Sequence, residues 1–236
     1  MKRLVLVLGL AGAAAAFTVQ PAAATNECRG LMVCLRVAGP WVVVSSGVAT
    51  PRARVDFQLS CPRGFTVAGL DAQLSDRAID VNFLGKLGSP VGPGVTTSRS
   101  ALFGATYVGA LARPPTFRPL LGCIPAAGGG GGPVPYRRPT AVYPPGEAVI
   151  RRVRTVRLRP GSVRAIAACG RGERLISGWH AVGFYTSVPP AQSLVDSVRV
   201  TRAIRNGRID ASVRSGSSLA RVRAIVQVGA VCGGGS

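Results

Sequence analysis

The sequence predicts an all-β protein made of two tandem, disulfide-stapled modules, each a small sandwich or barrel of five to seven short strands. Two observations lead to this fold. The helix-favouring residues Glu, Lys and Gln are scarce, whereas Val, Thr, Gly and Pro are abundant. In addition, Cys61 and Cys123 stand 62 positions apart, Cys169 and Cys232 stand 63 apart, and both opening cysteines begin a Cys-x-Arg-Gly motif. The matched spacing and the shared motif indicate a duplicated unit.

The amino-terminal residues predict a signal peptide. A basic start at residues 1–3 precedes an apolar stretch from 4 to 17, and three alanines occupy positions 22–24. We expect a signal peptide of residues 1–24, cleaved after Ala24. A retained membrane helix needs roughly 20 apolar residues, and this stretch is shorter. We therefore expect a secreted, extracellular protein without a transmembrane span after cleavage, either free or associated with the cell wall.

Six cysteines in an oxidising compartment favour disulfides over a metal cluster. Six cysteines allow 15 connectivities, and the repeat selects one of them. Zinc is disfavoured because the short Cys-x5-Cys spacing has no further ligands nearby and His180 is the sole histidine. We expect no metal and no cofactor. The predicted disulfides are Cys28 with Cys34, Cys61 with Cys123, and Cys169 with Cys232.

The repeat continues beyond each opening cysteine. After the shared Arg-Gly, residues 65–72 read FTVAGLDA and residues 174–181 read RLISGWHA, with Glu173 as one extra residue. Arg-Gly predicts a tight turn, the run after it predicts a returning strand, and the later glycine predicts close backbone approach at a bulge. This motif resembles the cysteine-bracketed modules of secreted bacterial proteins with no assigned activity. The resemblance implies a secreted β module and transfers no catalytic residue.

A glycine- and proline-rich segment at residues 126–147 separates the two copies. It contains an unbroken glycine run at 128–132 followed by several prolines, a composition that does not form a packed element. We therefore predict module one at residues 25–125, module two at 148–232, and a loose tail at 233–236.

The last third of the chain gives the clearest strand pattern. Residues 198–205 and 208–214 alternate around Asn206-Gly207, the strongest short hairpin signal. A closing strand over 220–231 should repeat the alternation, with Arg221 and Arg223 on its polar face. In the hairpin, the pattern directs Val198, Val200, Ile204, Ile209, Ala211 and Val213 toward the core and Arg199, Arg205, Arg208 and Arg214 outward.

Positive charge is concentrated in the second copy. Removal of Lys2 and Arg3 from the 29 basic residues leaves 27 against 9 acidic ones, or +18. Residues 148–236 hold 15 basic and 3 acidic groups (+12), whereas residues 25–125 hold 10 and 5 (+5). Many arginines will serve only solubility. The remainder predict an anion-binding surface, because the guanidinium fork matches phosphate and carboxylate. The candidate residues are Arg151, Arg152, Arg154, Arg157, Arg159, Arg199, Arg205, Arg208, Arg214, Arg221 and Arg223.

The candidate ligands are cell-wall teichoic acids, anionic lipids, acidic polysaccharides and extracellular DNA. Nucleic acid is expected to bind only non-specifically, because the chain has no nucleic-acid motif and too few aromatic residues for a stacking platform. No pattern specifies an oligomeric state.

Signals for catalysis are weak. The chain has no Gly-x-Ser-x-Gly, no His-Glu-x-x-His and no phosphate-binding glycine loop. His180 follows Trp179 in the repeated motif, and a half-buried histidine at a strand end is favoured over a general base. Asp71, Asp76 and Asp80 form the best carboxylate group for a glycosidase or for calcium, although aspartates are common in turns.

These patterns predict a secreted, non-catalytic binding protein at the cell envelope that contacts anionic polymers through its arginine-rich second module. Two alternatives remain open. One is a secreted polysaccharide hydrolase that uses Asp71, Asp76 and Asp80. The other is a structural envelope component with no specific ligand.

Overall fold

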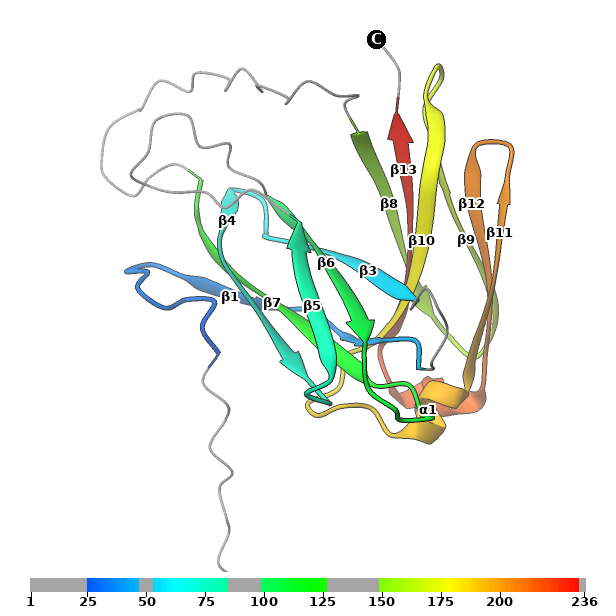
Figure 1. Ribbon diagram of the computed structural model, residues 1–236, viewed down its shortest axis with the longest axis horizontal. Coiled ribbons are helices and arrows are strands. Elements are labelled where there is room, and N and C mark those ends of the chain that lie inside the picture. The colour runs from blue at the N-terminus through cyan, green and yellow to red at the C-terminus, as the bar shows by residue number, and fades with distance from the viewer. Residues whose placement is uncertain (1–24, 47–52, 85–98, 127–148, 234–236) are drawn as a thin grey trace, which may run out of the picture.

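The computed structural model describes residues 25–46, 53–84, 99–126 and 149–233 (Figure 1). Thirteen strands dominate this part of the chain, accompanied by one short α-helix and one 3-10 helix, so the predicted all-β class is confirmed. None of the helices in these ranges is long and apolar enough to cross a membrane. The predicted signal peptide, nearly all of the predicted linker and residues 234–236 lie outside the described residues.

The first half of the chain forms two layers. Strands β1 and β2 lie end to end along one side of β7, separated by Gly39 and Pro40, and β4 pairs with the other side of β7. The second layer has the order β3-β6-β5. The strands are β1 (Leu35–Ala38), β2 (Trp41–Val43), β3 (Arg54–Ser60), β4 (Phe65–Leu74), β5 (Ile79–Leu84), β6 (Ser100–Tyr107) and β7 (Thr116–Pro125).

The second half repeats this arrangement. Strand β13 pairs with β10 on one side and β8 on the other, and a separate three-stranded sheet has the order β11-β12-β9. The elements are β8 (Val149–Leu158), β9 (Gly161–Ala168), β10 (Arg174–Phe184), α1 (Gln192–Asp196), β11 (Val198–Arg205), β12 (Arg208–Ser215), η1 (Ser217–Arg221) and β13 (Ala224–Gly233). The closing strand therefore begins at Ala224, four residues later than predicted, because residues 217–221 form the 3-10 helix.

The two halves share most of their strand order and pairings, with β8 of the second half in the place of β1 and β2 of the first. The strand before the opening cysteine, β3 or β9, lies in the three-stranded sheet, and the strand after it, β4 or β10, lies in the other layer. The three-stranded sheets β3-β6-β5 and β9-β12-β11 correspond, as do the pairs β4-β7 and β10-β13. This crossing of layers is the connectivity of a Greek-key sandwich. The correspondence supports the duplication that the cysteine spacing predicts.

Each half also has a β-bulge at the same distance from its opening cysteine. The register shifts between Val67 and Gly69 in the first half and between Leu175 and Ser177 in the second. A methyl group at Gly69 would lie 1.7 Å from the backbone oxygen of Glu27, so the predicted close approach occurs there. Ser177 is thus the structural equivalent of Gly69, and the sequence alignment of Gly69 with Gly178 is wrong by one residue.

The disulfides are the three pairs that the repeat predicts. Cys61–Cys123 and Cys169–Cys232 have Cα–Cα distances of 5.8 and 5.6 Å, and Cys28–Cys34 closes a short loop at 5.7 Å. Cys61 and Cys169 directly follow β3 and β9, which lie in the three-stranded sheets. Cys123 and Cys232 lie on β7 and β13 of the large sheet, so each of these two disulfides joins one layer to the other. The disulfides therefore hold the two layers of each half together.

The halves are joined directly as well as through the chain. Strand β2 pairs with β7 of the first half and β10 of the second, which makes one continuous seven-stranded sheet. Gln227 of β13 is 4 % exposed, and its side-chain amide accepts from the backbone N of Gln58 at 2.7 Å and donates to the backbone O at 2.9 Å. Ala181 and Ile225 also pack into the core of the first half. The two halves are thus docked through backbone, polar and apolar contacts.

Candidate functional site: an arginine face

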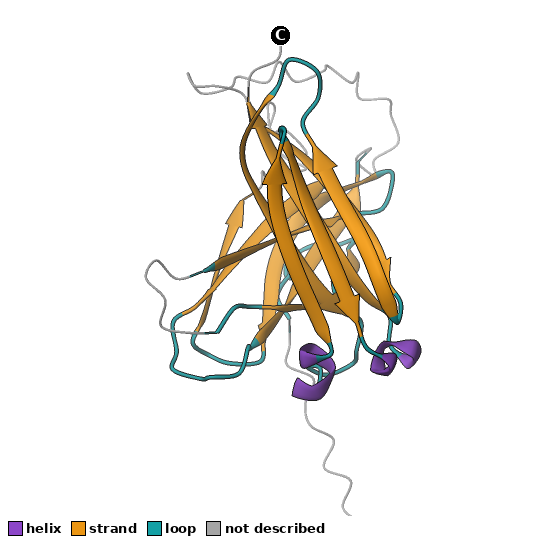
Figure 2. Ribbon diagram, turned by 90° about the vertical axis from the view of Figure 1, so that its right-hand side faces the viewer, coloured by secondary structure: helices purple, strands orange, loops and turns teal. Residues whose placement is uncertain are grey.

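The β11–β12 hairpin forms where the sequence predicts it. Asn206 and Gly207 have φ angles of +48° and +69°, the left-handed values that a type I′ turn requires. The two strands stay in register over eight pairs, and β9 runs along the other side of β12. Figure 2 views the molecule from the side on which these strands lie in Figure 1.

One face of this sheet is core. Ile209, Ala211 and Val213 of β12 are at most 1 % exposed, and they pack with Ala165 and Ala167 of β9. Because successive side chains of a strand point to opposite faces, the residues between them point to solvent. Ile204 is predicted to point toward the core, and it pairs with Ile209 near the turn. Its side chain is nevertheless 56 % exposed.

The other face of the sheet collects arginines. The register sets Arg199 opposite Arg214 and Arg205 opposite Arg208. These four are the arginines that the alternation directs outward. Arg164 of β9, which pairs with Ser212, lies on the same face. We call these five residues the arginine face: Arg164, Arg199, Arg205, Arg208 and Arg214.

The only carboxylate that the described strands place on this face is already engaged. Asp210 accepts a hydrogen bond from Arg164 Nε at 2.7 Å and a second from Arg164 Nη2. This bonding is the main reason that the pKa of Asp210 lies below its ordinary value, and the charges of Arg208 and Arg205 lower it further. Sequence analysis missed Arg164, although the alternation in residues 161–168, with Val163, Ala165 and Ala167 inward, could have found it.

The four remaining arginines form two cross-strand pairs, and none of the four makes an ion pair with a carboxylate in the described part of the chain. Like charges directly opposite each other on a sheet repel. The pairs are six residues apart along β11, which corresponds to about 20 Å. Beside Arg199 and Arg214 lies a shallow hollow of about 320 Å³, lined also by Ser162, Ser215 and Asp196. The face therefore presents two cationic clamps, Arg199 with Arg214 and Arg205 with Arg208.

The other candidate arginines are dispersed. On β8, Arg152 and Arg154 point to one side of the sheet and Arg151 and Arg157 to the other, as their alternate positions in the ladder with β13 require. Arg159 follows the end of β8. Arg221 ends the 3-10 helix, and the guanidinium of Arg223 lies 4.3 Å from the ring centre of Tyr185, a cation–π contact. The structure thus brings together four of the eleven predicted residues.

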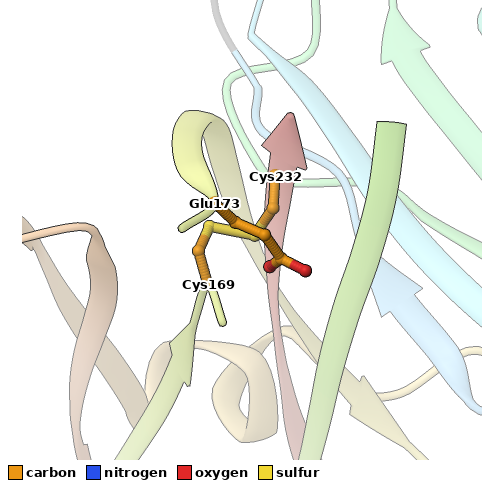
Figure 3. Close-up of side chains that lie close together, drawn as sticks. All are labelled: Cys169, Glu173 and Cys232. Carbon is orange, nitrogen blue, oxygen red and sulfur yellow. A yellow bond between two sulfur atoms is a disulfide. The ribbon is translucent and has the colours of Figure 1, made fainter. Parts of the chain in front are cut away.

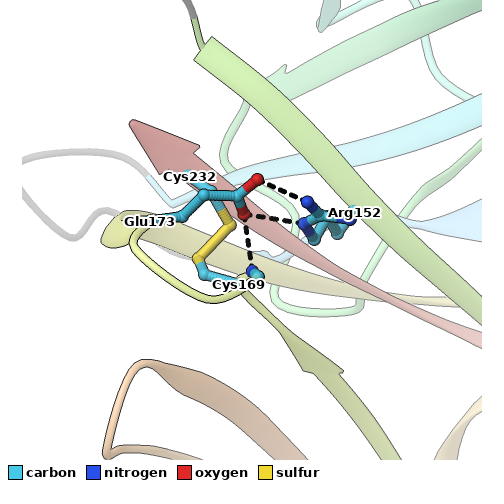
Figure 4. Close-up of polar contacts among 5 residues, drawn as sticks. Arg152, Cys169, Glu173 and Cys232 are labelled. Atoms are coloured by element: carbon cyan, nitrogen blue, oxygen red, sulfur yellow. Dashed lines mark hydrogen bonds and ion pairs between the residues drawn. A yellow bond between two sulfur atoms is a disulfide. The ribbon is translucent and has the colours of Figure 1, made fainter. Parts of the chain in front are cut away.

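Arg152 forms an ion pair with Glu173 within the fold. Glu173 lies beside the Cys169–Cys232 disulfide (Figure 3). Its carboxylate accepts hydrogen bonds from Arg152 Nε at 2.7 Å and from the backbone N of Gly170 at 2.6 Å (Figure 4). These bonds lower the pKa of Glu173 to about 2. Glu173, Cys169 and Cys232 are the one group in the described ranges with the proximity of metal ligands, but the two sulfurs are bonded to each other. The cluster fastens the turn to β8.

Two of the three predicted carboxylates accept hydrogen bonds from the backbone. Asp71 accepts from the backbone N of Asn26 at 2.7 Å, and Asp76 accepts from that of Ala78 at 2.8 Å. Asp71 lies on β4 in the large sheet, whereas Asp80 lies on β5 in the three-stranded sheet.

His180 is half-buried, as predicted, but it lies inside β10 and not at a strand end. Its pKa is lowered by burial and, secondarily, by the charge of Arg202. Both residues line a hollow of about 550 Å³ between β10, β11, the end of β2 and the start of β3. Arg202 is held there by a hydrogen bond from its Nη1 to the backbone oxygen of Gly178, at 2.9 Å.

No protein-family model, curated protein or solved structure matches the chain. The function must therefore be inferred from the chemistry of these residues.

Proposed function

We propose that this is a secreted, non-catalytic binding protein that holds anionic polymers at the cell envelope on its arginine face. The observation that carries the proposal is that two arginine pairs lie directly opposite each other on neighbouring strands, Arg199–Arg214 and Arg205–Arg208, and that none of these four residues makes an ion pair in the described part of the chain. A sheet serving only as scaffold gains nothing from such pairs, because like charges in direct opposition destabilise it. A bound phosphate, sulfate or carboxylate converts that repulsion into attraction.

The spacing of the clamps favours a polymer over a small anion. Each clamp offers two guanidinium forks, which match oxyanions with two parallel hydrogen bonds. A ligand that reaches across about 20 Å engages both clamps, and the second contact then forms at high effective concentration. Secretion is supported by the three disulfides, which persist in oxidising compartments.

The test is salt-dependent retention on immobilised heparin or polyphosphate. The triple variant Arg199→Gln, Arg205→Gln, Arg214→Gln removes three charges from the face. The matched control, Arg63→Gln, Arg77→Gln, Arg113→Gln, removes three charges from exposed arginines of the first half. Because each lost contact removes close to one unit from the slope of log affinity against log salt, the face variant should lose about 2 to 3 units and the control should keep the native slope. Equal losses in both variants would show that only net charge matters.

Ligand length provides a second test of the two-clamp geometry. Tripolyphosphate is too short to reach both clamps, whereas long-chain polyphosphate can bridge them. We expect the long chain to bind the native protein more tightly per phosphate, and this advantage to disappear in the double variant Arg205→Gln, Arg208→Gln, which keeps one clamp. An advantage that persists in the variant would contradict bridging. The measurement is isothermal titration calorimetry at low salt.

A further inference from the structure

The loop closed by Cys28–Cys34 exposes apolar side chains on the first half of the molecule. Met32 is 103 % exposed, Val33 62 % and Leu35, just after the loop, 42 %. Single exposed apolar residues are ordinary, but here three fall within four positions, and we call the two inside the loop, Met32 and Val33, the apolar tip. The arginine face does not account for this feature, because it lies on β9, β11 and β12 of the other half.

The structure fixes this tip in its protruding position. The disulfide closes the loop, and hydrogen bonds from Arg29 N to Asn26 O at 3.0 Å and from Leu31 N to Cys28 O at 3.2 Å shape its turns. The backbone before it is seated on the large sheet: methyl groups at Gly69 and Gly122 would lie 1.7 and 1.9 Å from the Glu27 oxygen. Met32 and Val33 are thus held away from the core.

The side chains beside the tip present positive charge to the solvent. Arg29 is exposed and stands at the start of the loop. The Arg36 side chain is 63 % exposed, whereas Glu27, its ion-pair partner at 3.3 Å, is only 2 % exposed. The carboxylate therefore lies beneath the guanidinium, and an approaching surface meets the cation first.

We propose that this loop inserts its Met32–Val33 tip into the surface of an anionic phospholipid bilayer, with Arg29 and Arg36 at the headgroups. An interfacial anchor combines a small apolar group in the acyl boundary with cations that attract anionic lipids. A protein partner fits less well, because stable protein interfaces need about 800 Å² per partner and use aromatic anchors, and this loop has no aromatic residue. The insertion is reversible, since few side chains take part.

The direct test is co-sedimentation with vesicles of phosphatidylcholine alone and of phosphatidylcholine mixed equally with phosphatidylglycerol. The arginine face could itself attract anionic vesicles, so all variants are made in the Arg199→Gln, Arg205→Gln, Arg214→Gln background. Burial of one such side chain in an apolar medium changes partition by roughly tenfold or more. Met32→Ser with Val33→Ser should therefore weaken binding to mixed vesicles by about 100-fold. The matched control, Val188→Ser with Ile204→Ser, alters apolar side chains that are 65 % and 56 % exposed and should bind unchanged.

A spectroscopic variant reports insertion itself. Trp41 and Trp179 are only 5 % and 6 % exposed, so their emission should not respond to vesicles. Val33→Trp should show a blue shift with mixed vesicles and quenching by lipid-attached quenchers. Unchanged sedimentation of the serine variant, or an unshifted emission of the Val33→Trp variant with bound vesicles, would overturn the proposal. Equal loss of polymer retention in the face variant and its control would contradict the polymer proposal and leave this one untouched, so the two proposals fail separately.

Discussion

Replacement of one member of a cross-strand arginine pair should stabilise the protein while it weakens polymer binding. Arg199 is exposed and lies opposite Arg214. Threonine is well accommodated in strands, so Arg199→Thr removes the repulsion without a packing loss. Like-charge pairs in direct opposition cost about 0.2 to 1 kcal/mol. The variant should therefore gain roughly 0.5 kcal/mol in free energy of unfolding at low salt.

A second variant separates pair repulsion from other effects. Arg151 is also an exposed strand residue, but it lies opposite Val231. Arg151→Thr removes one charge and makes the same change in strand propensity without relieving a pair. The assay is urea unfolding with the disulfides intact, at low and high salt, because salt screens repulsion between exposed charges. The stability advantage of Arg199→Thr over Arg151→Thr should shrink as salt rises.

Bound polymer should reverse the order of stability. A ligand at 100 times its dissociation constant stabilises the folded state by about 2.7 kcal/mol. The native protein, with both clamps intact, should bind the polymer more tightly than the variant and should therefore gain more stability from it. With saturating polyphosphate, native protein should thus unfold at higher urea than Arg199→Thr. If Arg199→Thr is no more stable than Arg151→Thr at low salt, the repulsion is absent and the argument for the clamps fails.

Three further predictions concern the fold. Gln227→Leu leaves the backbone groups of Gln58 without their buried partner and should cost about 1 to 3 kcal/mol in urea unfolding; an unchanged midpoint would mean that the halves dock without it. Conversion of both Cys169 and Cys232 to Ala should cost about 4 kcal/mol, because the closed loop spans 63 residues, and the reduced native protein gives the comparison. The folded-state pKa of Glu173 lies below its ordinary value of 4.5, so its contribution to stability is present above pH 4.5 and is lost as the pH falls toward about 2. The Glu173→Gln variant should therefore lose less stability over this pH range than the native protein. An equal loss in both proteins would show that other carboxylates dominate the pH dependence.

Features with local signals could be predicted from the sequence. The hairpin follows from Asn206-Gly207, whose left-handed φ angles suit few other residues. The long disulfides follow from spacing, because equal loops in two copies of one fold join equivalent strands. The outward direction of Arg199 and Arg214 follows from strict alternation. These features depend on a few neighbouring residues or on one repeat.

Features that depend on distant pairing could not be predicted. No local pattern shows that β2 pairs with β10, or that Gln227 reaches Gln58 across 169 positions. The basic run on β8 looks like one cluster in sequence, yet a strand sends alternate side chains to opposite faces, so Arg151 and Arg152 diverge. Whether an arginine is free or paired also depends on long-range contacts, as the Arg152–Glu173 pair illustrates.

The shared sheet changes what a break in the chain would do. The pairing of β2 with β10 and the bonding of Gln58 by Gln227 hold the halves together without relying on the peptide connection between β7 and β8. A protease that cut this connection should leave a nicked but associated molecule, whose two fragments separate only on denaturation. The connection is accordingly a natural place for a break in the chain.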